Sequence, residues 1–339
     1  MTVRILFFVG LSGIKLSFPT GRGERFANKF LISNDRTVIE KLVQPYKANI
    51  GSVEHRFLTE DCPNLIYSDG HVADDDVVDL EKFARDSTIA SLSRVQQFLH
   101  SLWVVKDNAA FEDRGWTITL LGPTRHHIHN NHWNARKFMA DGSRREVQFD
   151  RNDLRLARLA VPDASPRYLF ETGDPTALTE QAGRVSRFVY FVQCARDTDD
   201  IALKIVQYFS ALEALVSSSS AELTHQVSER VASLLEPPGQ ARIALFQRLR
   251  RGYGIRSQAV HGSGFRSKSQ DALRNSAIEV DETCRIILRK IYSDNHIADI
   301  FDLANENFAS FFHNLILGDP NGGDTEEFSK EPDTADSPP

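Results

Sequence analysis

The stretch Ile201-Ala-Leu-Lys-Ile-Val-Gln-Tyr-Phe-Ser-Ala-Leu-Glu-Ala-Leu-Val216 decides how the second half of the chain folds. Its apolar residues recur at intervals of three and four, which is the period of a helix with one buried face. That predicted face holds Ile201, Ile205, Phe209, Leu212 and Leu215. Asp197 or Thr198 can cap the N-terminus of this helix. We therefore predict a helix that packs one side against other helices.

The neighbouring segments show the same helical spacing and no strand pattern. Further helices are predicted from about Asp174 to Arg196, through Val227, Val231 and Leu235, from Ala241 to Tyr253, from about Ser269 to Tyr292 and from about Ile297 to Leu317. Asp174-Pro175 supplies an N-cap followed by proline at the first helical position. Ser220 or a neighbour can cap the third helix, and Gly252 and Gly254 are expected to end the fourth. Residues 171–317 are thus predicted to form a helical bundle.

The first part of the chain, residues 1–170, mixes strand and helix patterns. Short β-branched and aromatic blocks between glycine turns predict strands at Val3–Leu11, Ile14–Phe18 and Phe30–Ile32. Apolar spacing of three and four predicts a long helix from Asp79 to Val105. Trp116–Leu121 alternates like a strand, and Arg144–Phe149 is a candidate to pair with it. The predicted fold class is α+β: an N-terminal α+β domain followed by an all-helical bundle.

Acidic residues are concentrated at the C-terminus of this 339-residue chain. Residues 318–339 hold seven acidic side chains and one lysine, which accounts for the whole formal net charge of −6. This composition cannot bury enough apolar surface to order itself, so a disordered acidic tail is predicted. The remainder is about neutral overall, and local positive charge decides whether it binds a polyanion. The length suits two domains of about 100–200 residues each.

Cysteine usage and hydropathy indicate the cellular compartment in which the protein is expected. Cys62, Cys194 and Cys284 are scattered, odd in number and form no C-x-x-C pair, which argues against a disulfide framework and a thiolate metal site. The apolar run Ile5–Leu11 is too short for a secretory signal and is typical of a strand. No run approaches the roughly 18 apolar residues that span a membrane. We expect a cytoplasmic protein without metal, cofactor or membrane partner.

A basic segment without acidic residues lies between Pro237 and Gln270. It contains Arg256-Ser-Gln-Ala-Val-His261-Gly262. An arginine can fork onto a phosphate, and an imidazole titrates near neutrality, so this pair is the minimum set for metal-free cleavage of a phosphodiester that carries a 2′-hydroxyl. Flanking RNA phosphates would be bound by Arg248, Arg250, Arg251, Arg266 and Lys268, and Arg242 completes the basic residues of the segment.

The two candidate catalytic residues have distinct predicted roles. His261 can act as base or acid because the unperturbed pKa of histidine lies near 6.5. Arg256 is suited to stabilise the phosphorane, since its planar set of N–H donors interacts most strongly with the negative charge that develops in the transition state. On one regular helix, residues five apart lie about 140° around the axis and roughly 7.5 Å along it, so they do not share a face. Glycines around the motif permit a bend; the alternative, which we favour, is a two-fold dimer that pools the two side chains.

Three segments carry a family resemblance. They are Tyr208-Phe-Ser-Ala-Leu-Glu-Ala-Leu215, Ser228-Glu-Arg-Val-Ala-Ser-Leu-Leu235, and Leu249–Tyr253 with the R-x4-H motif that follows it. Together they resemble the Apea-like HEPN domain, a branch of the HEPN superfamily of helical bundles, over roughly Asp174 to Ser293. Ser101–Asn108 is similar to a segment upstream of this domain. The resemblance implies a metal-independent, commonly dimeric endoribonuclease in microbial toxin or anti-phage systems, with Arg256 and His261 at its catalytic positions.

The residues around the motif leave alternatives open. Ser257 departs from the family pattern, because many active members place Asn, Asp or His directly after the arginine. A serine hydroxyl can exchange hydrogen bonds but carries no charge, so an RNA-binding domain that no longer cleaves is an alternative. Glu213 and Arg230 lie among apolar neighbours and could form an internal ion pair; otherwise Glu213 orients a catalytic side chain. Tyr253 is the further supporting residue.

Two features outside the basic segment invite other interpretations. Histidine is the commonest metal ligand, and Arg125-His-His-Ile-His-Asn-Asn-His-Trp133 would place His127 and His129 on one face of a strand. The tract holds no carboxylate or thiol, so we expect a solvated loop, with a metal site or an RNA contact as alternatives. Trp103 is expected in the core of the first domain, with Lys106 and Asp107 solvated at the helix end; docking against the helical domain is the alternative.

Three functions fit these observations. The leading one is an endoribonuclease that uses the 2′-hydroxyl as nucleophile, with an N-terminal domain that senses a trigger or holds the nuclease inactive. The second is a non-catalytic RNA- or nucleotide-binding module, and the third is a dimeric interaction protein. The expected partners are RNA, a second copy of the chain, and an activating partner or ligand at the N-terminal domain.

Overall fold

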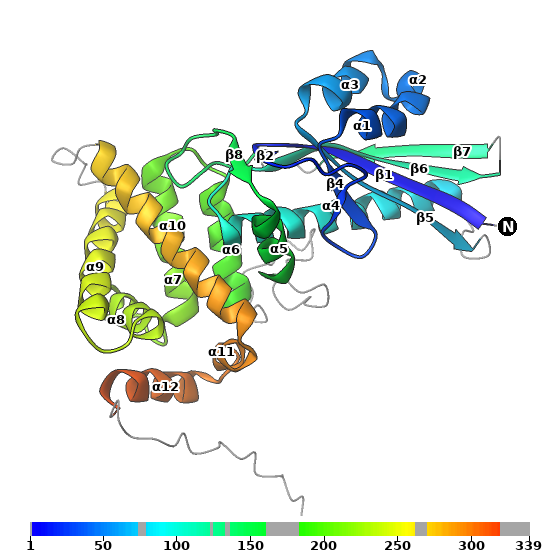
Figure 1. Cartoon of the computed structure of the whole chain (residues 1–339). Helices are drawn as coiled ribbons and strands as arrows, with labels where there is room; N and C mark the ends of the chain where they lie inside the picture. Colours follow the sequence, from blue (N-terminus) through cyan, green and yellow to red (C-terminus); the bar gives the residue numbers. More distant parts are fainter. Residues whose placement is uncertain are drawn as a thin grey trace, which may run out of the picture.

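The computed structural model in Figure 1 describes residues 2–73, 79–122, 125–132, 136–160, 183–261 and 270–318. An antiparallel sheet with covering helices forms the N-terminal half, and a group of helices forms the C-terminal half. The predicted α+β fold class is confirmed. The cap at Asp174-Pro175 and the tail beyond Gly318 lie outside the described residues, so those predictions stay predictions.

Six strands form one antiparallel sheet in the order β3-β4-β5-β1-β6-β7. They are β1 (Thr2–Ser12), β3 (Glu24–Arg25), β4 (Phe30–Ser33), β5 (Asn64–Ala73), β6 (Phe111–Leu121) and β7 (Arg125–Asn131). A separate parallel pair joins β2 (Ile14–Leu16) to β8 (Val147–Phe149). The predicted pairing of residues 144–149 with residues 116–121 is wrong, because β1 and β7 already occupy both edges of β6.

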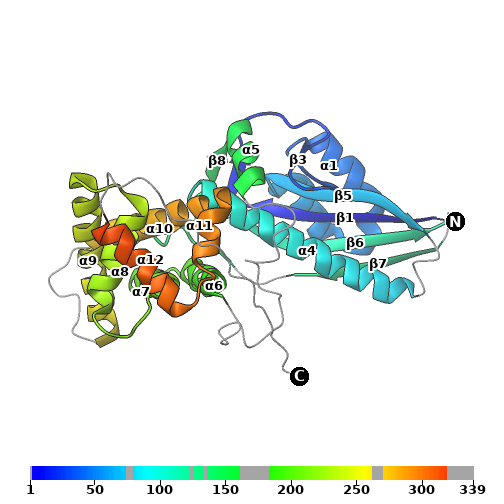
Figure 2. The same cartoon turned by 90° about the horizontal axis from the view of Figure 1, so that it is seen from below.

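Helices cover both faces of the sheet, so the side chains of β1 are buried on both sides. Phe7, Val9 and Leu11 share a core with the long helix α4 (Leu80–Val105), which runs along one face of the sheet in Figure 2. The other face packs against the helices between β4 and β5, namely α1 (Arg36–Val43), η1 (Gln44–Tyr46), α2 (Lys47–Ile50), α3 (Ser52–Arg56) and η2 (Phe57–Asp61). A Cβ at Gly115 of β6 would lie 2.8 Å from Leu92 Cδ2, so glycine permits the close approach of α4.

Helix α5 (Arg151–Ala160) buries Leu154 and Ala157 in the core shared by the sheet and α4. The C-terminal half contains α6 (Arg184–Arg196), α7 (Ile201–Val216), α8 (Leu223–Leu235), α9 (Gln240–His261), α10 (Gln270–Ser293), α11 (Asn295–Ile300) and α12 (Asn305–Leu317). Two predicted caps are wrong: Asp200 caps α7, and Glu222, whose side chain makes no capping bond, precedes α8. The predicted last helix is divided into α11 and α12. The turn between them allows both Phe301 and Phe308 to be buried. No helix among the described ranges has an apolar stretch long enough to cross a membrane.

Helix α9 does not end at its glycines, as the sequence predicted, but continues through them to His261. Gly252 lies against Phe209 of α7, where a Cβ would come within 2.8 Å of the ring. Glycine therefore permits two helices to pack closely at this point instead of breaking one of them. The buried face of α9 includes Leu245, Leu249 and Tyr253.

The end of α4 enters the core of the helical half. Trp103 is fully buried in the cluster formed by α6, α7 and α10, and its Nε1 donates to Oδ1 of the buried Asp281 at 3.0 Å. Tyr208 of α7 donates its hydroxyl to the same oxygen at 2.6 Å. Arg285 Nε donates to Oδ2 at 2.9 Å. The expected position of Trp103 in the first core is wrong, and the docking alternative is confirmed.

The two charged residues after Trp103 are also engaged. Lys106 donates to Asp153 Oδ2 of α5 at 2.6 Å. Asp107 Oδ2 accepts from the backbone N–H of Ala140 at 3.0 Å, and burial raises the pKa of Asp107 to about 6. Both side chains therefore fix the chain that leaves α4, whereas the sequence predicted that they would be solvated.

Replacement of Asp281 tests how strongly this carboxylate stabilises the fold. We expect Asp281→Ala to lower the free energy of unfolding by about 3–5 kcal/mol, because it leaves a buried guanidinium without its main partner and two buried donors without an acceptor. Denaturant unfolding measures the loss. Asp271→Ala, at an exposed position of the same helix, is the control and should stay within about 0.5 kcal/mol of the native chain. Equal stability of the two variants would contradict the role given to Asp281.

Candidate functional site

Glu213 on α7 binds two side chains of α9. Tyr253 donates its hydroxyl to Glu213 Oε1 at 2.5 Å, and one terminal nitrogen of Arg256 lies 3.2 Å from both carboxylate oxygens. Residues three apart on a helix lie on one side of it, so a single carboxylate reaches both. The guanidinium carbon of Arg256 is 5.3 Å from the centre of the Tyr253 ring. The candidate catalytic arginine is therefore positioned by an ion pair and an aromatic ring.

The site leaves Arg256 with hydrogen-bonding capacity. Its side chain is 22% exposed, and its Nε is buried without a hydrogen-bond partner among the described residues. A guanidinium has five N–H donors, and the contacts with Glu213 involve one nitrogen. Burial, followed by the hydrogen bond to Glu213, raises the pKa of Tyr253 to about 12, so the phenol remains a donor at neutral pH. The arrangement can present a fixed cation to an anion.

Arg230 does not pair with Glu213, so the predicted internal ion pair is wrong. Its guanidinium donates to the carbonyl of Val216 at 2.6 Å and to Ser218 Oγ at 3.0 Å, and it lies 5.1 Å from the centre of the Phe312 ring. Val216 is the last residue of α7. A cation is favoured at that carbonyl end of a helix, whereas Glu213, one turn earlier, faces α9.

Arg256 and His261 belong to one uninterrupted helix. Positions five apart on such a helix differ by about 140° around its axis. The bend that would bring the pair together is not formed at Gly252 or Gly254, both of which are helical. The side chain of His261 lies outside the described part of the chain, as do residues 262–269. Ser257, between the pair, is half-buried.

Three of the predicted RNA-binding residues lie on the outer surface of α9. Arg248, Arg250 and Arg251 are exposed, and none of them forms an ion pair with a described residue. The guanidinium of Arg250 lies 5.7 Å from the centre of the half-buried Phe246 ring. Arg266 and Lys268 fall within residues 262–269, outside the description. The described surface of α9 thus offers three cations available to phosphates.

Residues 125–131 of the histidine tract form strand β7, so the loop predicted for this part of the tract is wrong, whereas His132 follows the strand. His127 and His129 pair with Thr119 and Thr117 of β6 and lie on one face. His129 Nδ1 is 3.1 Å from Thr88 Oγ1 of α4, which attaches the strand to that helix. No group of three or more possible metal ligands occurs among the residues that the structure describes.

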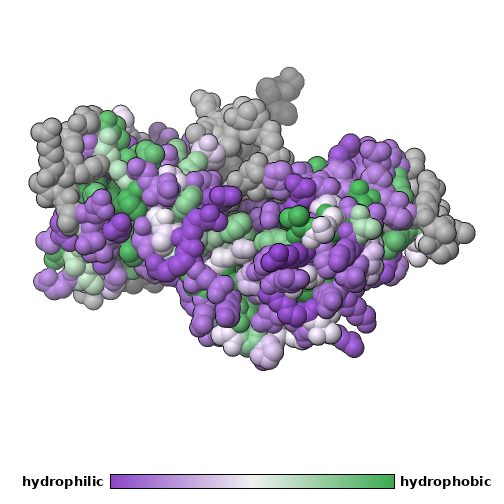
Figure 3. Space-filling view, turned by 90° about the horizontal axis from the view of Figure 1, so that it is seen from above, coloured by the Kyte–Doolittle hydropathy of each residue, from purple (hydrophilic) through white to green (hydrophobic). Residues whose placement is uncertain are grey.

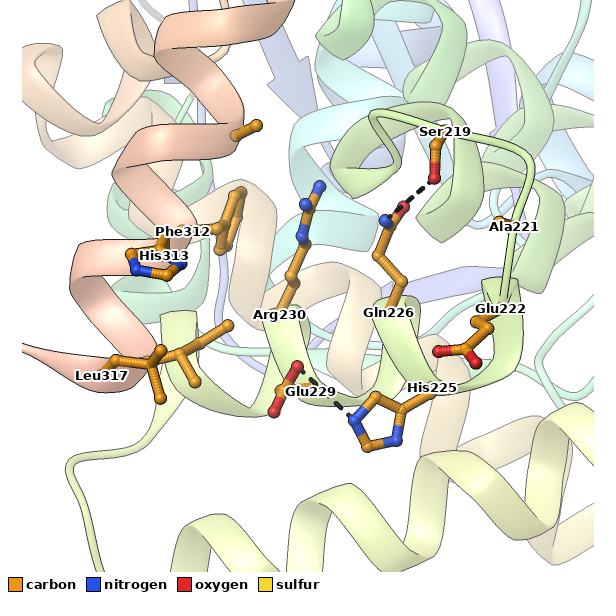
Figure 4. Close-up of a pocket in the computed structure, with 12 residues that line it drawn as sticks. Ser219, Ala221, Glu222, His225, Gln226, Glu229, Arg230, Phe312, His313 and Leu317 are labelled. Carbon is orange, nitrogen blue, oxygen red and sulfur yellow. Dashed lines mark hydrogen bonds and ion pairs between the residues drawn. The ribbon is translucent and has the colours of Figure 1, made fainter.

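A cavity of about 540 Å³ lies between α8 and α12, and the sequence analysis did not identify it (Figure 4). Its lining includes His225, Gln226, Glu229, Arg230, Phe312 and His313. Polar residues three and four apart on α8 were the available signal, because they form one stripe of a helix. Their counterpart on α12 is more than 80 residues away in the sequence, so spacing alone could not reveal the space between the two helices.

Comparison of the chain with family models, with curated proteins and with solved structures finds no match in any of the three. The interpretation of the site therefore depends on its own residues and their chemistry.

A double-mutant cycle tests the hydrogen bond between Tyr253 and Glu213. Tyr253→Phe and Glu213→Gln should each destabilise the fold by about 1–3 kcal/mol, and the double variant by clearly less than their sum, because each single change removes the same charged hydrogen bond. Denaturant unfolding of the four proteins gives the coupling free energy. Additivity within about 0.5 kcal/mol would show that the two side chains do not interact.

Proposed function

We propose that the protein is an endoribonuclease that cleaves RNA without a metal ion. The observation that supports this most is the fixed arginine: Arg256 is held by Glu213, has donors without a partner among the described residues, and lies on the helix that exposes three further arginines. The resemblance to the HEPN superfamily supports the same activity and suggests a role in microbial toxin or anti-phage systems.

The proposed reaction is transesterification within the RNA. A base removes the proton from a 2′-hydroxyl, and the 2′-oxygen attacks the adjacent phosphorus. The bond from phosphorus to the 5′-oxygen then breaks, and an acid protonates the leaving oxygen, so the products are a 2′,3′-cyclic phosphate and a 5′-hydroxyl. His261 is assigned to proton transfer. Arg256 is assigned to the phosphorane, whose negative charge exceeds that of the substrate.

The active unit is proposed to be a two-fold dimer. One α9 separates its own Arg256 and His261 by about 140°, and a two-fold axis is the simplest way to combine the arginine of one protomer with the histidine of the other. The N-terminal half is proposed to regulate the nuclease. Trp103 gives it a physical connection, since the end of α4 is built into the helical core.

A non-catalytic RNA-binding module is the second candidate. It is favoured by Ser257, which cannot titrate, and by the ion pair with Glu213, which offsets part of the charge of Arg256. In this case the exposed arginines of α9 would bind RNA in a salt-dependent manner without cleaving it.

Incubation of purified protein with total RNA in excess EDTA tests the proposal. The native chain should degrade RNA, and Arg256→Ala and His261→Ala should each reduce the rate by at least about 10²-fold while circular dichroism stays unchanged. His296→Ala, at an exposed position of α11, is the matched control and should retain full activity.

Three results would contradict the enzyme assignment or its two residues. They are intact RNA after prolonged incubation with the native chain, cleavage that appears only when Mg²⁺ is added, and full activity of either variant. Intact RNA combined with salt-dependent binding that Arg256→Ala weakens would select the binding module.

A further inference from the structure

The cavity between α8 and α12 is connected to the Arg256 site through the last turn of α7. Arg230, which lines the cavity, binds the carbonyl of Val216. Glu213, which binds Arg256, lies three residues earlier on α7. This separation corresponds to about 4.5 Å along a helix. The cavity and the fixed arginine are therefore anchored to the same turn.

An aromatic pair links the cavity to the exposed arginines of α9. The ring of His225, at the edge of the cavity, lies edge-on to Phe246 of α9 with 5.4 Å between ring centres. The guanidinium of Arg250 lies 5.7 Å from the same Phe246 ring. Single-stranded nucleic acids bind to surfaces that combine aromatic rings with arginines, because bases stack on the rings and phosphates pair with the cations. A strand bound at Arg250 would therefore pass the cavity.

The lining of the cavity suits a base and not a phosphate. The α12 side is largely apolar, with Phe312, Ile316 and Leu317. The α8 side carries two carboxylates, Glu222 and Glu229, and Arg230 is the one arginine among the lining residues. Two carboxylates beside one arginine disfavour an anion but can accept hydrogen bonds from the N–H groups of a neutral ligand. The volume lies within the range of small-molecule sites.

The backbone conformation of Glu222 supports a role of its carboxylate in binding a ligand in the cavity. Its φ of 49° is the one positive value at a non-glycine residue in the described ranges. Its side chain does not cap α8, although it stands at the cap position. Figure 4 shows its carboxylate beside His225 at the cavity. Unfavourable backbone conformations of this kind cluster at functional sites, and here the conformation orients a carboxylate that α8 does not use.

We propose that this cavity binds an unpaired guanine base of single-stranded RNA. The inference rests on the proposed function in one respect, namely that RNA is the ligand. Guanine presents two adjacent N–H donors, at N1 and N2, beside the acceptor O6. A single carboxylate can accept from both adjacent donors, and Glu222, whose side chain makes no capping bond, is suited to this role. Glu229 lies 3.6 Å from His225 Nε2. Arg230 can donate to O6 with the N–H groups that it does not use at Val216 and Ser218. The phosphate next to this nucleotide remains outside the cavity, at Arg250.

Binding of two labelled RNAs tests the proposal without depending on cleavage. The probes are an oligouridine and the same oligouridine with one central guanosine, measured by fluorescence anisotropy with the His261→Ala variant in EDTA. We expect the guanosine probe to bind about tenfold more tightly. Glu222→Gln should remove most of this preference, and Ala309→Trp, which fills the cavity, should abolish it. Glu306→Gln, at an exposed position of α12, is the matched control and should retain it.

The outcomes separate this inference from the proposed activity. Equal binding of the two probes, or an unchanged preference in both cavity variants, would overturn the guanine site. If the native chain cleaves both probes but the anisotropy shows no preference, only the cavity inference fails. If it cleaves neither probe but binds guanosine more tightly, only the catalytic proposal fails.

Discussion

The buried carboxylate of Asp281 is the interaction on which the rest of the structure depends. Burying a charge costs several kcal/mol unless it is paired and hydrogen-bonded, and here Trp103, Tyr208 and Arg285 provide that compensation. These donors come from α4, α7 and α10, so one group ties the long helix of the sheet to the centre of the helical half. Because α7 also carries Glu213, the helix that the carboxylate fixes is the one that positions Arg256.

The site follows from how α7 and α9 pack. Gly252 lets α9 approach Phe209, and the close approach brings Tyr253 and Arg256 to Glu213. Helix α9 continues without interruption through its glycines, so positions 256 and 261 lie about 140° apart around its axis. A chain that needs both groups on one phosphate can obtain them by combining two copies, as in the proposed dimer. Fixing the arginine in advance also reduces the reorganisation required when charge develops on a bound phosphate.

Helical periodicity made much of the fold predictable. Contacts between residues that are distant in the sequence could not be predicted in this way. Four of the five residues predicted for the buried face of α7 are buried, namely Ile205, Phe209, Leu212 and Leu215, because a 3.6-residue period is a local property. Ile201 is only half-buried, and the buried Tyr208 was not predicted. Strands β5 and β7 were missed: the end of β5 is polar and exposed, and β7 consists of histidines and asparagines that take their order from β6. Pairing of Glu213 with Arg256 instead of Arg230, and burial of Trp103 beside Asp281, depend on helix packing that spacing does not encode.

The most direct test of the central claim is the chemistry of the RNA ends. Mass spectrometry of the fragments released from a defined oligonucleotide in EDTA identifies both new termini. Attack by the neighbouring 2′-oxygen, with Arg256 and His261 as the only assigned catalytic groups, predicts a 2′,3′-cyclic phosphate on one fragment and a 5′-hydroxyl on the other. A 3′-hydroxyl together with a 5′-phosphate would show that water was the nucleophile and would contradict the account.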